Sequence, residues 1–209
     1  MKKLLIILVS GTVLIFACAG LTFWLSWQPQ SWYAPLDYSS QEIKTLADRA
    51  EYRLNEEFHK VRPATDVWRL RITDEAMNAW LSGRLEGWLT HDQEVRIPKE
   101  IQNPQVHITP SGVWVAAMVE IQDDSPRPVA LQLSIQIVDG VATILPVAIR
   151  LGKMPIPMSV FEQIVQDTQE RAGDIPSIVP LMDDREVQIQ EITFEEGALV
   201  LTCQTYLPQ

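Results

Sequence analysis

The sequence predicts an α+β protein, with an N-terminal transmembrane helix followed by one domain in which an antiparallel sheet packs on amphipathic helices. Three observations lead to this fold class: a long apolar segment opens the chain, apolar residues recur at helical spacing in three later segments, and residues 105–151 alternate between apolar and polar around turn signals. The chain has 209 residues, of which 46% are hydrophobic and 21% charged, as is typical of a globular protein.

The apolar segment Leu4–Trp27 carries no charge and is longer than the roughly 20 residues that a helix needs to cross the hydrocarbon core of a bilayer. Lys2 and Lys3 precede it, and the first charge after it is Asp37. The preference of positive flanks for the cytoplasm then predicts a cytoplasmic tip at residues 1–3. The domain is expected on the outer side of the inner or plasma membrane, in a periplasm or outside the cell.

A cleaved signal peptide is the alternative for this segment, because Ala17-Cys18-Ala19 has the small residues of a cleavage site. A lipoprotein form of this alternative would acylate Cys18, but Phe16 is bulky for that recognition. The apolar sequence continues for several residues beyond Cys18, which favours an uncleaved anchor. In either case the domain lies outside the cytoplasm.

Residues 28–37, with Pro29 and Pro35, are predicted to form a short stalk between the anchor (residues 4–27) and the domain (residues 38–209). Aromatic residues cluster where the anchor leaves the membrane, and their amphipathic rings suit the headgroup layer. They are Trp24, Trp27, Trp32 and Tyr33.

The domain is predicted to begin with a helix. Ser39 and Glu42 have the spacing of a capping box, and the helix should run to about Lys60. Its apolar residues recur at helical spacing while the other face is charged, so one stripe is buried. The stripe consists of Ile43, Leu46, Ala47, Ala50, Leu54 and Phe58.

A strand at residues 67–72 and a second helix follow, with Thr73 or Asp74 as the cap of that helix. Gly83 and Gly87 lie along the second helix and allow close packing against another element. Its stripe is the most strongly amphipathic of the domain and consists of Met77, Trp80, Leu81, Leu85, Trp88 and Leu89.

Residues 105–151 are predicted to form an antiparallel meander, in which Asp139-Gly140 is a strong hairpin signal. The expected strands are Gln105–Thr109, Val113–Gln122, Val129–Ile137 and Val141–Leu151. Residues 113–119 are apolar at every position, which is typical of a strand covered on both faces. The cover of the second face could be a helix, another strand or a ligand.

The last part of the chain is predicted to contain one helix and one hairpin. Ser159 and Glu162 form a second capping box, and this helix should end near Gly173. A link with Pro176 and Pro180 follows. The closing hairpin should pair Val187–Phe194 with Ala198–Tyr206.

The composition argues against several functional classes. A net charge of −10 disfavours nucleic-acid partners and anionic surfaces. His59, His91 and His107 lack metal-ligand spacing, and Cys18 and Cys203 are not expected to pair. The sequence contains no motif for a nucleophile, a metal or a cofactor, so the protein is not expected to be an enzyme. A converging pair of buried carboxylates would reverse this expectation.

Three segments resemble the bacterial YpmS-type single-pass membrane proteins and the wider tubular lipid-binding (TULIP-like) group. They are Ile72–Leu81 at the start of the second helix, Val138–Gly140 in the meander, and Leu151–Pro157 before the third helix. The resemblance covers about residues 38–206. It implies a curved antiparallel sheet that wraps a helix around an apolar groove, and non-enzymatic binding or handling of lipid.

The primary functional hypothesis is therefore an apolar groove that takes a lipid tail. Its expected lining is apolar and aromatic: Trp80, Leu81, Leu85, Trp88, Trp114, Met118, Phe161 and Ile164. The alternative is an interaction or assembly module that docks another envelope protein, with a packed core and an exposed apolar patch or sheet edge.

Overall fold

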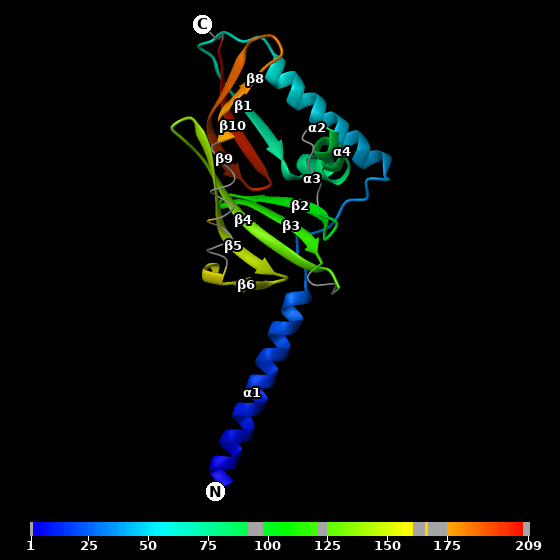
Figure 1. Cartoon of the computed structure of the whole chain (residues 1–209), viewed down its shortest axis with the longest axis vertical. Coiled ribbons are helices and arrows are strands. Elements are labelled where there is room, and N and C mark those ends of the chain that lie inside the picture. The colour runs from blue at the N-terminus through cyan, green and yellow to red at the C-terminus, as the bar shows by residue number, and fades with distance from the viewer. Residues whose placement is uncertain (1, 92–97, 121–124, 161–165, 167–174, 207–209) are drawn as a thin grey trace.

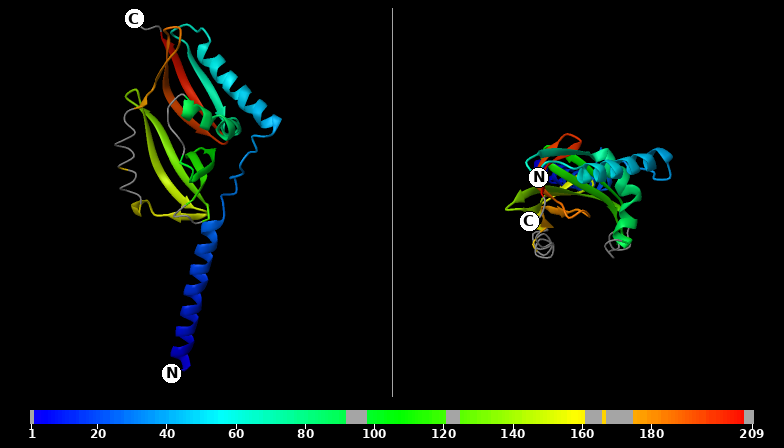
Figure 2. Two further views of the ribbon diagram at one scale, coloured as in Figure 1. Left: turned by 45° about the vertical axis from the view of Figure 1, so that its right-hand side comes forward. Right: turned by 90° about the horizontal axis from the view of Figure 1, so that it is seen from above.

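The structure, a computed structural model, describes residues 2–91, 98–120, 125–160, 166 and 175–206. Helix α1 (Lys2–Trp27) extends from one end of an elongated body, and the two chain termini lie at opposite ends of the molecule (Figure 1). The body contains curved antiparallel sheets and further helices, which confirms the α+β class. The single predicted sheet is replaced by two, a six-stranded sheet next to α1 and a four-stranded sheet at the far end (Figures 1 and 2).

Helix α1 is long and apolar enough to span a membrane, and its residues from Ser10 to Trp24 are exposed, whereas its last three residues contact the body. A signal sequence would meet the same criteria of length and composition.

The four-stranded sheet has the order β1-β10-β9-β8. Its strands are β1 (Val67–Thr73), β10 (Ala198–Tyr206), β9 (Glu186–Glu195) and β8 (Ile178–Pro180). The closing hairpin is confirmed, with Gly197 at a positive φ of 70° in its turn. The segment around Pro176 and Pro180 was predicted only as a link. It contains two short strands, β8 and the two-residue strand β7 (Ile175–Pro176).

The six-stranded sheet has the order β2-β3-β4-β5-β6, and β7 pairs with β5. Its strands are β2 (Ile101–Thr109), β3 (Gly112–Val119), β4 (Arg127–Val138), β5 (Val141–Leu151) and β6 (Met154–Ile156). Asp139 and Gly140 both have positive φ, 51° and 78°, as a two-residue hairpin turn with the strand twist requires. The predicted meander is thus confirmed.

Helix α2 (Gln41–His59) forms as predicted, but the capping box does not. Ser40 takes the N-cap position, one residue after the predicted Ser39, and its side chain makes no capping hydrogen bond. Phe58 at the other end packs edge-on against Trp68 of β1, with ring centroids 5.7 Å apart. Arg185 caps that end by donating to the carbonyls of His59 and Lys60.

The second predicted helix is divided into α3 (Asp74–Gly83) and α4 (Leu85–His91). Thr73 caps α3 by accepting a hydrogen bond from the Ala76 amide at 3.2 Å, as predicted. Gly83 permits close packing, since a Cβ atom there would meet the Tyr38 ring, whereas Gly87 has open space. Of the third predicted helix the structure gives the short turn η1 (Met158–Val160), and most of its remainder lies outside the described residues.

The two sheets are joined through the outer edge of β2. The Asn78 side chain of α3 donates to the Val106 carbonyl at 2.8 Å and accepts from the Val106 amide at 2.7 Å. The Gly197 amide of the β9–β10 turn donates to the Ile108 carbonyl at 2.9 Å. A side-chain amide and a turn thus satisfy backbone groups that a further strand would otherwise bind.

The main core lies where the two sheets and the helices meet. It is apolar throughout and consists of Trp68, Leu70, Val106, Ile108, Val113, Val187, Leu199, Leu201 and Cys203. Phe58, Met77 and Leu81 from the helices pack against it. Burial of this cluster is the main favourable contribution to the stability of the far half of the domain.

Gly112 is expected to be intolerant of a side chain, because it has φ +128° and a Cβ atom would lie 2.3 Å from the Leu133 carbonyl oxygen of β4. Gly112→Ala should lower the free energy of unfolding by more than about 2 kcal/mol. Gly87→Ala is the matched control and should raise it by about 0.5–1 kcal/mol. Urea unfolding of the full-length protein in detergent, followed by circular dichroism, measures both. Equal stabilities of the two variants would contradict this packing.

Cys203 is expected to be chemically inert in the folded protein. Burial raises the pKa of its thiol from the ordinary 9.0 to about 11, so the nucleophilic thiolate is absent at neutral and mildly alkaline pH. Iodoacetamide at pH about 8.5 should leave Cys203 unmodified in detergent and modify it in urea, as measured by peptide mass spectrometry. Since the unfolded thiol ionises first, stability should fall as pH rises between these two pKa values. Rapid labelling of the folded protein would contradict the burial.

Candidate functional site

The end of α1 is bonded directly to the six-stranded sheet. The Lys153 amide in the β5–β6 turn donates to the Leu25 carbonyl at 2.9 Å. The buried side chain of Gln30 donates to the Gly152 carbonyl and accepts from the Arg150 guanidinium. Gly152 has φ +58°, and a Cβ atom there would lie 2.4 Å from the Leu25 carbonyl oxygen, so only glycine fits this contact.

Residues 31–34 continue along the outer face of the same sheet. The Trp32 ring stacks on His107 with centroids 5.1 Å apart, and the Tyr33 hydroxyl donates to the Asn103 carbonyl at 2.8 Å. Ala34 exchanges two backbone hydrogen bonds with the side chain of Gln105. The segment predicted as a stalk therefore packs on the domain and does not act as a free spacer.

These contacts identify the cover of the second face of β3. Trp114 and Ala116 form a small cluster with Ala130, against which Trp32 and Tyr33 pack. The protein's own chain covers this part of the strand, so no ligand is needed there. Trp32 and Tyr33, which were expected to suit the headgroup layer, pack on the sheet.

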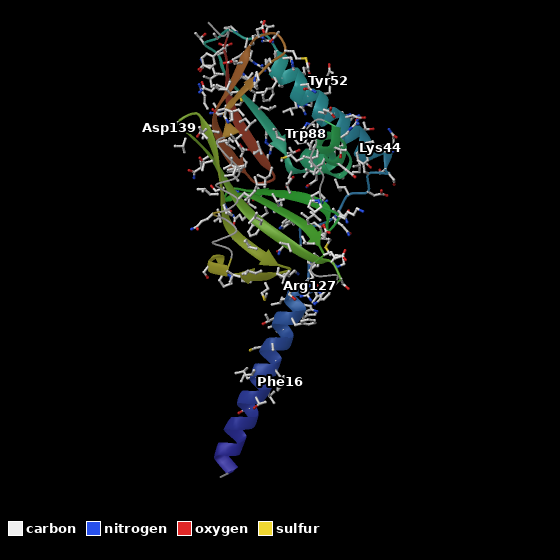
Figure 3. The ribbon with its side chains drawn as sticks, in the orientation of Figure 1. Phe16, Lys44, Tyr52, Trp88, Arg127 and Asp139 are labelled. Carbon is white, nitrogen blue, oxygen red and sulfur yellow. The ribbon has the colours of Figure 1, made fainter. Side chains whose placement is uncertain are left out.

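Arg127, at the first position of β4, lies where α1 meets the body (Figure 3), and its guanidinium stands 4.4 Å from the centre of the Trp27 ring. Arg150 stands 4.6 Å from the centre of the Trp114 ring in the same region. Two cation–π contacts thus reinforce the hydrogen bonds of the junction. These contacts join the end of α1 to the six-stranded sheet.

The opposite face of the six-stranded sheet, termed here the inner face, is apolar from Val129 of β4 onward, after Arg127 at the first position of that strand. Directly paired residues of antiparallel strands share a face. Leu131 of β4 pairs with Val115 of β3 and Ile149 of β5, and Ile149 pairs with Ile156 of β6. Between Val129 and Ile137, the register places only apolar residues on this face of β3–β6.

The inner face divides into two parts. One part enters the main core through Val113, Val115 and Ile135. The other part, on β5, β6 and the start of β4, carries apolar side chains that are partly exposed and that, within the described part of the chain, belong to neither core cluster. These are Val129, Leu131, Ile144, Ile149, Leu151, Met154 and Ile156. This part is the candidate binding face.

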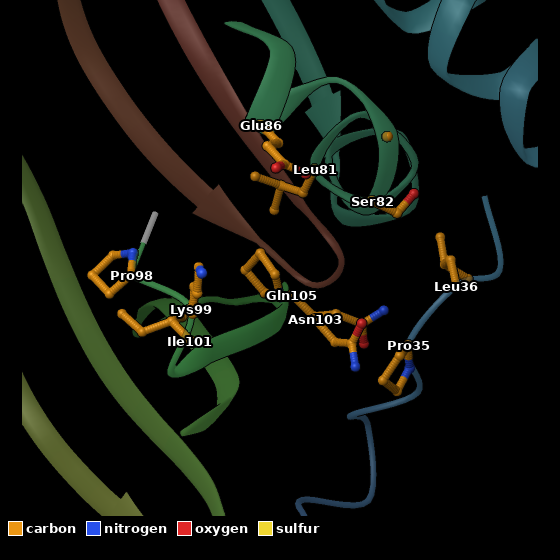
Figure 4. A pocket seen from close by; sticks show the side chains of 12 residues that line it. Pro35, Leu36, Leu81, Ser82, Glu86, Pro98, Lys99, Ile101, Asn103 and Gln105 are labelled. Carbon is orange, nitrogen blue, oxygen red and sulfur yellow. The ribbon is translucent and has the colours of Figure 1, made fainter. Parts of the chain in front are cut away.

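A separate pocket of about 320 Å³ lies between α3, the start of β2 and residues Pro35–Leu36 (Figure 4). Leu81 lines it together with charged and polar side chains, including those of Glu86 and Lys99. This mixed lining does not suit an acyl chain, which requires a predominantly apolar wall.

The eight residues predicted to line one groove are distributed over different places. Trp80 and Trp88 contact each other edge-on, with centroids 6.0 Å apart, and Trp88 is 41% exposed on α4 (Figure 3). Leu81 packs against the main core, whereas Leu85 on α4 is partly exposed. The remaining residues lie elsewhere.

Trp114 and Met118 belong to the outer face of β3, because they pair with Gln132 and Pro128 of β4 and Trp114 is in the cluster under Trp32. The structure therefore separates them from the helix residues. Phe161 and Ile164 lie outside the described residues. The inner-face positions of β4–β6 were missed as a candidate site, although the alternation of residues 129–137 in the sequence had marked those of β4.

His107 and Asp74 form a second feature that the sequence did not predict, with Nδ1 and Oδ2 3.3 Å apart. Both side chains are partly buried, and Trp32 covers the imidazole ring. No group of three potential metal ligands occurs among the residues that the structure describes. Since Asp74 begins α3 and Trp32 stacks on His107, the pair links the segment at Trp32 to the start of α3.

No family model matches this chain, and no curated protein matches it at a significant level.

The junction predicts a difference between two glutamines on the same segment. Gln30→Ala should lower the free energy of unfolding by about 1–3 kcal/mol, because it removes the hydrogen bonds that Gln30 makes to the Gly152 carbonyl and to Arg150. It should also speed proteolysis within residues 28–37 in detergent. Gln28→Ala is the control, because Gln28 bonds to Leu25 through its backbone amide, which alanine retains, and it should change neither quantity. Identical behaviour of the two variants would rule out a structural role for the junction.

Proposed function

We propose that this protein is a membrane-anchored, non-catalytic lipid-binding protein of the YpmS or TULIP-like kind. In this proposal α1 remains as the anchor, the domain lies outside the cytoplasm, and acyl chains rest on the inner face of the six-stranded sheet near α1. The single observation that carries the proposal is the register of β3–β6, which gathers apolar side chains on one face and leaves those near α1 outside the two core clusters of the described residues.

The dimensions of this face support an acyl ligand. From Leu151 to Ile144, β5 covers about 20 Å at about 3.3 Å per residue. The hydrocarbon layer of one leaflet is about 15 Å thick, half of the bilayer core. One extended acyl chain therefore fits along the strand.

The junction supports the retention of α1. Leu25 and Gln30 are bonded to the β5–β6 turn, and Trp27 lies under Arg127. The end of the apolar helix is thus part of the folded body. An uncleaved anchor with the positive residues Lys2 and Lys3 on its inner flank is the arrangement most consistent with these contacts.

A protein-docking module is the second candidate, and a specific observation favours it. The loop after α2 and the loop between β8 and β9 lie at the end of the domain far from α1 (Figure 1). They contain Val61, which is 84% exposed, and Met182, which is 99% exposed. Exposed apolar loops at one tip suit a partner protein. Cross-linking discriminates the two candidates, because they predict adducts of different chemistry at different places.

Ile144 and Leu145 offer a matched test. They are neighbours on β5, both 38% exposed, and their pairing with Ile135 and Ser134 places them on opposite faces. The photoreactive residue p-benzoylphenylalanine at position 144 of the full-length protein should yield lipid adducts in native membranes, detected by peptide mass spectrometry. The same residue at position 145 should yield few. Equal lipid labelling would indicate general exposure, and protein adducts at residue 61 or 182 without lipid at 144 would favour the docking module.

A further inference from the structure

The bonds between α1 and the β5–β6 turn place one end of the apolar face at the bilayer. Lys153 donates its amide to Leu25, which lies two residues before the end of α1. At about 1.5 Å of rise per residue, this contact is only a few ångströms from the last apolar turn of the helix. The turn therefore reaches the boundary between acyl chains and headgroups when α1 spans the membrane.

Met154, the residue after Lys153, belongs to the first set of cross-strand partners on the apolar face. Met154 pairs with Leu151, and Leu151 pairs with Val129. The Gly152 amide between them donates to the Pro128 carbonyl at 2.6 Å, which holds this row together beside the end of α1. The row of Val129, Leu151 and Met154 is termed here the membrane-side row.

The other end of the apolar face is closed by described residues. Ile135 of β4 packs against the main core, and β7 pairs with Val141 and Ala142 at the far end of β5. The Ser177 amide donates to the Gly140 carbonyl at 2.9 Å and ties the following segment to the same end. A chain that approaches from that side would have to displace these contacts.

We infer that the ligand is an acyl chain of a lipid from the outer leaflet of the membrane in which α1 lies, and that it reaches the inner face across the membrane-side row. The inference rests on the proposed function and names the source and direction of the ligand. Its physical reason is that hydrophobic cost grows with the apolar area exposed to water. A chain that slides from the leaflet onto a row a few ångströms away keeps most of its length covered throughout.

The test uses the full-length protein with p-benzoylphenylalanine at position 144, reconstituted in vesicles whose phospholipids have deuterated acyl chains. Unlabelled vesicles are added in excess before irradiation. The adduct at position 144 should carry the deuterated chain of the host bilayer. An adduct with the unlabelled chain would overturn the inference, because the lipid would then have come through water or from a second membrane.

Two variants of β6 test the route itself. Met154→Glu puts a charge in the membrane-side row, and it should reduce the lipid adduct at position 144 by about tenfold or more, since an apolar chain does not pass an unpaired carboxylate. Pro155→Glu is the matched control, because Pro155 pairs with Arg150 and points to the other face, and its adduct should stay within about twofold. An unchanged adduct in Met154→Glu would overturn the route while leaving lipid binding intact.

The outcomes separate this inference from the proposed function. If the protein without a change at position 154 gives no lipid adduct at position 144, the proposed function fails and the inference fails with it. If adducts form but carry the unlabelled chain, only the inference fails. Should Met154→Glu prevent folding, as judged by its thermal unfolding in detergent, the deuterated-chain experiment still decides, because it needs no change in the membrane-side row.

Discussion

The two-residue period of β4 is the constraint on which the rest of the structure depends. Its odd-numbered residues from Val129 to Ile137 are apolar, while Ala130 and Gln132 on the other face are buried by the chain that follows α1 and by the β2–β3 turn. A slip of one residue in the register would exchange the two faces and move the apolar set to the side occupied by Trp32. The bulge opposite Gln132 and Leu133, which adds Val147 to β5, and the tight turn at Asp139-Gly140 help fix this register.

The register of β4 also determines which side chains meet the end of α1. The outer face of the sheet presents Gln105, Trp114 and Arg150 to residues 30–34. The side chains of Gln105 and Arg150 form hydrogen bonds with Ala34 and Gln30, so polar groups buried in this contact are paired. The last turn of α1 is thereby bonded to the six-stranded sheet. In the proposed function this matters energetically. Each methylene group taken from water contributes about 0.8 kcal/mol, so a face adjacent to the bilayer spares a long chain a cost on the order of 10 kcal/mol.

Much of the secondary structure could be predicted from the sequence because its signals are local. The alternation of residues 129–137, the Asp139-Gly140 turn and the Thr73 cap each act within a few residues. The failures have local causes as well. At the start of α2, Ser39 and Ser40 compete for the same role, and the structure uses the second. The helical spacing of apolar residues from Trp80 to Leu89 predicted one continuous helix. The structure interrupts it at Arg84, next to Gly83, which lowers helix propensity.

The sequence by itself determined the apolar helix, the amphipathic α2 and the long strands β1–β5, β9 and β10, since periodicity and turn chemistry depend only on neighbouring residues. It did not determine which apolar residues of different strands and helices lie together, because this depends on pairing and packing between elements that are distant along the chain. Trp88 and Trp114 both lie in apolar stretches of the sequence, yet Trp88 is exposed on α4 and Trp114 is buried under Trp32. Only the tertiary structure decided that the chain covers the outer face of β3 itself and gathers its remaining apolar surface beside α1.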